Sequence, residues 1–174
     1  MLRTSPAPTL GPETCSAASG HRRSSPRSGR APAARVAPVD GFNFSTDVSV
    51  RFAETDAQGI AHHASFVVWC EVARIAYLAE YAGGYLAIQA QGIEALTTDV
   101  HVRYVQAARF DDRLRIWTRC VDVRGARFRY EYAFERDGEL VADGWTGHAT
   151  VDAATHRPTR VPASFAEAVA RAES

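Results

Sequence analysis

The densest group of reactive side chains lies in one ten-residue stretch, residues 54–63, which reads Glu-Thr-Asp-Ala-Gln-Gly-Ile-Ala-His-His. The carboxylate of Asp56 can act as a nucleophile or as a general base toward water. Gly59 lets the chain fold back, and an apolar segment without Gly or Pro follows at residues 64–81, which predicts a helix. Unpaired amides at the start of that helix would polarise a carbonyl or hold an oxyanion.

Spacing alone leaves two interpretations of Asp56 open, because an aspartate shortly before a helix is also a common capping residue. No Ser-His-Asp or Cys-His arrangement competes with it. Cys15, Cys70 and Cys120 form no CxxC pair and no cluster with zinc-like spacing, so we expect no metal site. Unpaired thiols indicate a reducing compartment, with Cys70 and Cys120 serving as small hydrophobic residues.

The elements that must position these residues follow from the apolar pattern. The 64–81 segment is apolar around most of its circumference, which is typical of a buried helix, and Gly83-Gly84 should end it. Within it, Glu71 and Arg74 are three residues apart and can pair. One strand is expected before the helix, from Phe44 to Phe52.

Four more strands are expected after the helix, at residues 100–104, 114–120, 127–135 and 140–151. Asp137-Gly138 predicts a hairpin between the last two, and residues 164–171 could form a short closing helix. Strands with one apolar face need a covering layer, and the single long helix is the one available. The pattern therefore predicts an α+β fold in which an antiparallel sheet wraps around one long central helix.

The 174-residue chain has no net charge, but this neutrality averages two unlike parts. Every basic residue is arginine. Residues 1–38 hold six arginines, one acidic residue and six of the eight prolines, whereas the remainder holds 14 arginines and 19 acidic residues. We therefore expect a disordered Arg/Pro/Ser/Ala-rich tail over residues 1–42 and one folded domain over 43–174. The tail also fits an organelle transit peptide or an over-extended start of the reading frame.

Five motifs in one register carry a family resemblance. Residues 50–66 read Val-Arg-Phe-Ala-Glu-Thr-Asp-Ala-Gln-Gly-Ile-Ala-His-His-Ala-Ser-Phe, followed by Trp-Cys-Glu-Val-Ala-Arg at 69–74, His-Val-Arg-Tyr at 101–104, Ala-Arg-Phe-Asp-Asp at 108–112 and Thr-His-Arg-Pro-Thr-Arg-Val-Pro at 155–162. Together they resemble the 4-hydroxybenzoyl-CoA thioesterase family of hotdog-fold acyl-CoA thioesterases. The resemblance is closest to the bacterial branch associated with the Tol–Pal gene cluster, and it spans about residues 45–172.

The resemblance implies that the chain hydrolyses an acyl-CoA, or an acyl-carrier-protein thioester, to a free acid and a thiol. Asp56 would be the catalytic nucleophile or general base, and the backbone amide of His63 would polarise the thioester carbonyl. The His63 ring would orient Asp56 or line the acyl pocket, or the residue would contribute only its amide. His62 stands where the family usually has Tyr or Trp.

The resemblance also implies further substrate-binding residues, some of which have an alternative interpretation. They are Gly59 and His62 in the loop, Glu71 on the helix, and two arginines, Arg103 and Arg109, which would contact the CoA phosphates or be ordinary surface charges. Glu71 is also interpreted as the ion-pair partner of Arg74.

The resemblance also implies a homodimer, or a homotetramer of paired dimers, with active sites between subunits. No metal or bound cofactor is expected, because CoA enters as part of the substrate. No apolar run is long enough for a membrane span and no basic patch indicates a nucleic-acid partner, so a cytoplasmic protein is expected, or an organellar one if the tail is a transit peptide. Two rival functions are a hotdog dehydratase and a catalytically weak acyl-CoA-binding module.

Overall fold

The computed structural model describes residues 40–174. The predicted tail, up to residue 39, and Cys15 within it lie outside the described residues. The described part contains strands and helices in the order β1 (Phe44–Ser49), α1 (His63–Tyr81), α2 (Tyr85–Gln89), β2 (Ile93–Tyr104), β3 (Arg113–Arg124), β4 (Arg127–Arg136), β5 (Glu139–Asp152) and α3 (Ala163–Ala172), with a 3₁₀ turn at Phe52–Glu54 between β1 and α1.

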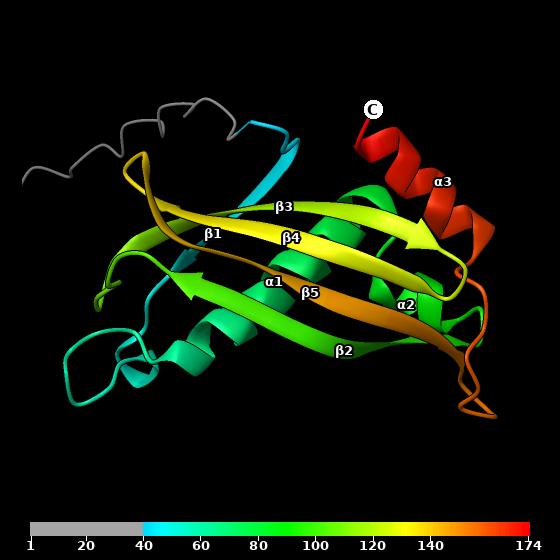
Figure 1. Ribbon diagram of the computed structural model, residues 1–174, viewed down its shortest axis with the longest axis horizontal. Coiled ribbons are helices and arrows are strands. Elements are labelled where there is room, and N and C mark those ends of the chain that lie inside the picture. Colours follow the sequence, from blue (N-terminus) through cyan, green and yellow to red (C-terminus); the bar gives the residue numbers. More distant parts are fainter. Residues whose placement is uncertain (1–39) are drawn as a thin grey trace, which may run out of the picture. The chain divides into compact units, whose positions relative to one another are not determined.

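All five strands form one antiparallel sheet in the order β1-β3-β4-β5-β2. The long helix α1 lies across one face of the sheet, behind the strands in the view of Figure 1, and α2 and α3 are shorter helices near the far end of α1. This is the hotdog fold, so the predicted α+β arrangement of a sheet around one central helix is confirmed.

The core forms where α1 meets the inner face of the sheet. Every second residue of a strand points to the same face, so the core side chains come from alternate positions, Leu114, Ile116 and Cys120 on β3 and Phe128, Tyr130, Tyr132 and Phe134 on β4. The packed side chains come from α1 (Phe66, Trp69, Cys70, Ala73, Tyr77) and from the sheet (Leu114, Ile116, Cys120, Tyr130, Tyr132, Phe134, Val141). Cys70 and Cys120 are unpaired and buried, as predicted.

Two turns follow the sequence prediction closely. Asp137 and Gly138 both have positive φ, 53° and 87°, which is the backbone geometry of a tight hairpin between β4 and β5. After α1, Gly83 and Gly84 have φ of 74° and 92°, and the helix ends there. The closing helix is present as α3, one residue longer at each end than predicted.

Several boundaries and one burial prediction were wrong. The first strand ends at Ser49, and Phe52 instead starts the 3₁₀ turn with 77% of its surface exposed. β2 begins at Ile93 rather than near residue 100, and α2 was not predicted. The helix is buried on one side only. On the other, four apolar side chains are exposed: Val67, Val68, Val72 and Ile75.

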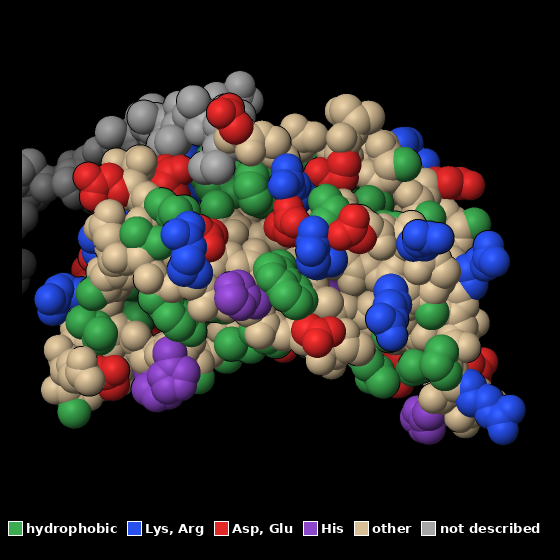
Figure 2. Space-filling view, in the orientation of Figure 1, with side chains coloured by type: hydrophobic (Ala, Val, Ile, Leu, Met, Phe, Trp, Pro, Cys, Tyr) green, Lys and Arg blue, Asp and Glu red, His purple; other side chains and the backbone are tan. Residues whose placement is uncertain are grey.

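The outer face of the sheet carries paired charges. Arg119 contacts Glu131 at 2.6 Å, and Arg115 contacts Asp47 at 3.1 Å across β1 and β3. Figure 2 shows basic and acidic side chains intermixed over this face rather than gathered by sign. None of the helices within residues 40–174 is long and apolar enough to cross a lipid bilayer.

Candidate active site

The segment of residues 54–63, the Asp56 loop, is a closed turn built by its own backbone. Thr55 and Ala61 form an isolated antiparallel bridge, and the amide of Asp56 donates to the carbonyl of Ile60 at 2.9 Å. Inside this bridge the amide of Gly59 donates to the carbonyl of Asp56, also at 2.9 Å. Gly59 has a φ of +72°, in the left-handed region that favours glycine, so the turn back predicted at this residue is present.

Glu54 fixes the loop to the start of α1. Its carbonyl accepts from the amide of His62 at 2.8 Å and from Ser65 Oγ at 3.0 Å. Its carboxylate accepts from Trp69 Nε1 at 3.0 Å and pairs with Arg51 at 2.8 Å. Burial raises the pKa of this carboxyl, but the hydrogen bonds from Arg51 and Trp69 outweigh burial and hold the pKa below its ordinary value. Glu54 is therefore an ionised anchor at neutral pH.

The start of α1 leaves one amide available. His62 caps the helix, because its Nδ1 accepts from the amide of Ala64 at 3.2 Å, and its carbonyl accepts from the amide of Ser65 at 2.9 Å. The amide of His63, between them, has no hydrogen-bond acceptor within residues 40–174. A free amide at the positive end of a 19-residue helix is suited to hold a carbonyl oxygen that gains negative charge.

Asp56 and His63 line the same cleft, of about 390 Å³, which we call the Asp56 cleft. Asp56 Oδ1 accepts from the amide of Gln58 at 2.8 Å, whereas Oδ2 makes no hydrogen bond in the described part of the chain. The structure therefore places Asp56 and His63 in the wall of one cleft. The remaining lining residues are Gln58, Ile60, Ala61, Phe66, Tyr104, Val105, Gln106, Ala107 and Ala108.

The far wall of the Asp56 cleft comes from the end of β2. The Tyr104 hydroxyl donates to the carbonyl of His63 at 3.2 Å, and its ring packs edge-on against Phe66 with centroids 5.1 Å apart. Tyr104 and Phe66 also line the cleft and were not predicted to do so, although both lie inside the motifs that carry the family resemblance. The missing signal was the contact between the end of β2 and the start of α1.

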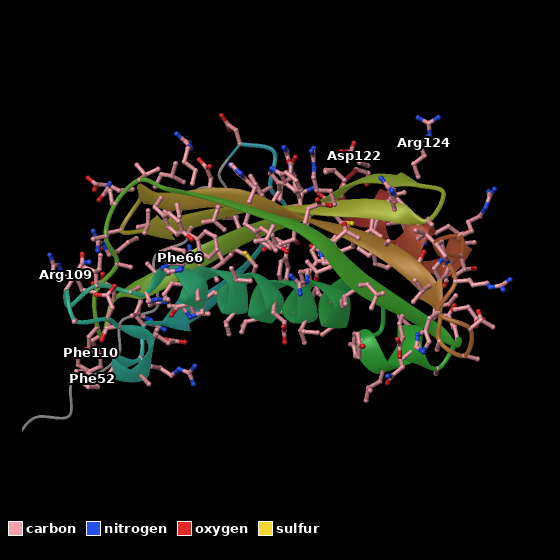
Figure 3. The ribbon with its side chains drawn as sticks, turned by 60° about the horizontal axis from the view of Figure 1, so that its bottom comes forward. Phe52, Phe66, Arg109, Phe110, Asp122 and Arg124 are labelled. Atoms are coloured by element: carbon pink, nitrogen blue, oxygen red, sulfur yellow. The ribbon has the colours of Figure 1, made fainter. Side chains whose placement is uncertain are left out.

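An aromatic pair lies beside the cleft on two neighbouring loops. Phe52 and Phe110 meet edge-to-face with centroids 5.9 Å apart, and both are more than half exposed. Figure 3 shows them with Arg109 at the same end of the domain as Phe66. Arg109 Nη1 reaches the carbonyl of Gly59 at 3.5 Å, so this exposed guanidinium borders the Asp56 loop.

Three of the predicted substrate-binding residues do not line the Asp56 cleft. His62 is occupied as a helix cap and packs against the His63 ring, with centroids 4.0 Å apart and the rings tilted by 35°. Arg103 is on β2 and pairs through two nitrogens with Asp143 of β5, outside the cleft. Glu71 lines a second cavity further along α1.

The predicted ion pair between Glu71 and Arg74 was wrong, because none of the ion pairs within residues 40–174 joins them. Both side chains instead line the second cavity. In the described region, no three His, Cys, Asp or Glu side chains come together as metal ligands.

The fold, a sheet around a central helix, is that of the hotdog thioesterases, and Asp56 and His63 line one cleft at the start of that helix. The chain belongs to the thioesterase-like superfamily, whose family profile matches residues 50–169. The predictions of a hotdog thioesterase family and of a thioester-hydrolysing enzyme are thereby confirmed, while the Tol–Pal branch stays a prediction.

Individual relatives agree with the family match. The putative acyl-CoA thioesterase YneP of Bacillus subtilis is 28% identical over 120 residues, covering 68% of this chain and 87% of that protein. The acyl-CoA thioester hydrolase YbgC of Escherichia coli is 28% identical over 123 residues, covering 70% and 92%. Among solved structures, the DHNA-CoA thioesterase of Staphylococcus aureus is similar with a TM-score of 0.69 and 27% identity, covering 73% of this chain and 88% of the other.

Proposed function

We propose that the protein hydrolyses acyl-CoA thioesters, with Asp56 as the catalytic carboxylate and the His63 amide as the oxyanion donor. The observation that carries this proposal is that both groups face one cleft while Oδ2 of Asp56 and the amide of His63 have no protein partner within residues 40–174. A thioester bound with its carbonyl oxygen on the His63 amide would present its carbonyl carbon to the Asp56 side of the cleft.

Two routes fit this geometry. In the first, Asp56 adds to the carbonyl carbon, the C–S bond breaks with release of the CoA thiolate, and water hydrolyses the resulting anhydride to the free acid. In the second, Asp56 takes a proton from water as the water oxygen adds to the carbonyl carbon, and the thiolate leaves in the next step. The His63 ring lines the cleft in both routes and would contact the acyl group or orient Asp56.

Relatives support a CoA thioester as the substrate, because YneP, YbgC and the staphylococcal enzyme carry acyl-CoA or DHNA-CoA in their names. Arg109, beside the loop and without an ion pair in the described region, would contact a CoA phosphate. Arg103 is less suited to this role, because Asp143 already occupies its guanidinium. CoA would enter as part of the substrate, with no resident cofactor.

A homodimer is proposed for the same protein. β2 is an edge strand of 12 residues, and Val100 on it and Val68 and Val72 on α1 are exposed apolar side chains. Pairing two copies along β2 would cover this surface and the unpaired strand edge. Light scattering after size exclusion should give twice or four times the chain mass, and Val68→Glu should shift it toward one chain.

Thiol release tests the proposed activity. Wild-type protein should be assayed on aliphatic and aromatic acyl-CoA thioesters and on the same acyl groups carried by acyl carrier protein. We expect turnover of at least one acyl-CoA, and the ratio of CoA to carrier-protein rates identifies the physiological thiol. Binding of acyl-CoA without any thiol release would contradict the proposal and favour the acyl-CoA-binding module, while water addition to an enoyl-CoA would favour the dehydratase.

A further inference from the structure

A second cavity, which we call the Arg74 cavity, lies beside the C-terminal half of α1. Its volume is about 530 Å³, within the range of small-molecule sites, and it shares no lining residue with the Asp56 cleft. Apolar side chains from three helices and from the sheet form most of its wall: Ile75, Leu78, Ile88, Ile93, Phe128 and Phe165. Its size and lining suit a compact apolar body such as one ring or a short chain.

The cavity also holds a cation that forms no ion pair. Arg74 is half-buried, lines the cavity, and forms none of the ion pairs found in the described region. On β5, burial and, to a smaller extent, the positive charge of Arg74 lower the pKa of His148 to about 4. His148 is therefore neutral at pH 7, and it adds no second cation to the wall.

A further side chain on the wall is the ring of Tyr130, which is 2% exposed and lies against the His148 ring with centroids 5.6 Å apart. Its hydroxyl is fully buried, so Tyr130 offers a ligand its ring and no polar contact. Glu71, the cavity's carboxylate, is exposed, so solvent screens its charge more than that of the half-buried Arg74.

We propose that the Arg74 cavity binds a compact carboxylate whose charged group pairs with Arg74 while its apolar or aromatic body packs against the lining side chains. Two sources share this chemistry. One is a free carboxylic acid. The other is an acyl group that ends in a carboxylate, and only this second source rests on the proposed function.

The second source needs two copies of the chain. Arg74 is 11 residues from His63, or roughly 16 Å along a helix that rises 1.5 Å per residue, so an acyl group in one chain would have to span that length. In a two-fold dimer joined along β2, with the axis across the sheet, the two α1 helices would run antiparallel, and the second half of one would lie beside the start of the other. The Arg74 cavity of one copy would then receive the acyl group from the Asp56 cleft of its partner.

Calorimetric titration of the full chain tests the cavity directly. The probes are phenylacetate and its neutral analogue phenylacetamide, which differ in charge but hardly in shape. We expect phenylacetate to bind about 10-fold to 100-fold more tightly than the amide, and Arg74→Gln to remove that difference. Glu71→Gln is the matched control on the same helix and cavity, and it should leave phenylacetate binding unchanged or slightly tighter. Thermal melting of each variant checks that it folds.

A kinetic comparison separates the two sources. Glutaryl-CoA ends in a carboxylate, whereas pentanoyl-CoA has the same chain length and no charge. Loss of a glutaryl preference in Arg74→Gln assigns the cavity to the acyl group. Arg74-dependent phenylacetate binding with unchanged relative rates assigns it to a free acid. If the wild type hydrolyses no thioester, the proposed function fails while the titration still decides the cavity. Binding and acyl preference that are both independent of Arg74 would overturn the proposal.

Discussion

The buried imidazole of His148 makes the stability of the fold sensitive to mild acid. It is 4% exposed, its Nε2 lies 2.8 Å from Thr146 Oγ1, and its ring stacks on Phe128 with centroids 5.2 Å apart. Burial, followed by the charge of Arg74, lowers its pKa from 6.5 to about 4. Above pH 6.5 the ring is neutral in both states. Between pH 6.5 and 4 mainly the unfolded chain takes up the proton, so stability falls as the pH falls.

The size of the effect follows from the pKa difference. One pH unit corresponds to about 1.4 kcal/mol. The titration of His148 should therefore lower the free energy of unfolding by roughly 2 kcal/mol at pH 5 and by about 3 kcal/mol below pH 4. Urea unfolding at pH 7.5 and pH 5.0, at one protein concentration, measures it. His148→Gln cannot titrate in this range and should lose about 2 kcal/mol less than wild type between the two pH values. Equal losses in the two proteins would refute the reasoning.

Three further substitutions test local geometry, each measured by urea unfolding. In Gly144→Ala the new Cβ would lie 2.2 Å from the His101 carbonyl oxygen, so we expect a loss of at least about 2 kcal/mol as β2 and β5 are pushed apart. In Gly59→Ala the new Cβ meets nothing within 4 Å. The free energy of unfolding should therefore fall by only about 1–2 kcal/mol, the cost of holding an alanine in the left-handed backbone conformation. Tyr104→Phe removes the hydrogen bond to His63 and should cost about 1 kcal/mol. A neutral Gly144→Ala, a Gly59→Ala loss above 3 kcal/mol or so, or a Tyr104→Phe without effect would contradict these contacts.

The sequence predicted the elements whose pattern is regular. Residues 64–81 are free of Gly and Pro and end at two glycines, and α1 occupies His63–Tyr81. The aromatic residues of β4 recur at every second position from Phe128 to Phe134, and its predicted bounds differ from the observed ones by one residue. β2 has a register shift between Thr97 and Asp99, which interrupts the period of two and conceals the first half of the strand. α2 has five residues, too few to show a helical period.

The site could be predicted only where its residues are neighbours in the chain. Asp56, Gly59 and His63 lie within eight positions, so turn chemistry predicted Asp56 near the amides at the helix start, and the family resemblance named His63 among them. Tyr104 joins them through a contact 41 positions apart, which depends on how β2 pairs with β5. The partners of Glu71 and Arg74 were mispredicted because helix spacing permits a pair without showing that both side chains turn toward a cavity.

Turnover by Asp56→Asn tests the central claim most directly. The amide has nearly the same shape as the carboxylate and can still accept the hydrogen bond from Gln58, but it neither attacks a thioester nor takes a proton from water. Asp122→Asn is the matched control, because Asp122 is an exposed carboxylate that lies well away from Arg109, the neighbour of the Asp56 loop, in Figure 3, and its φ of 56° suits asparagine. Thiol release at saturating acyl-CoA should fall roughly 10²-fold to 10⁴-fold in Asp56→Asn and stay within about twofold in Asp122→Asn. An Asp56→Asn protein that turns over at the wild-type rate would contradict the assignment of Asp56.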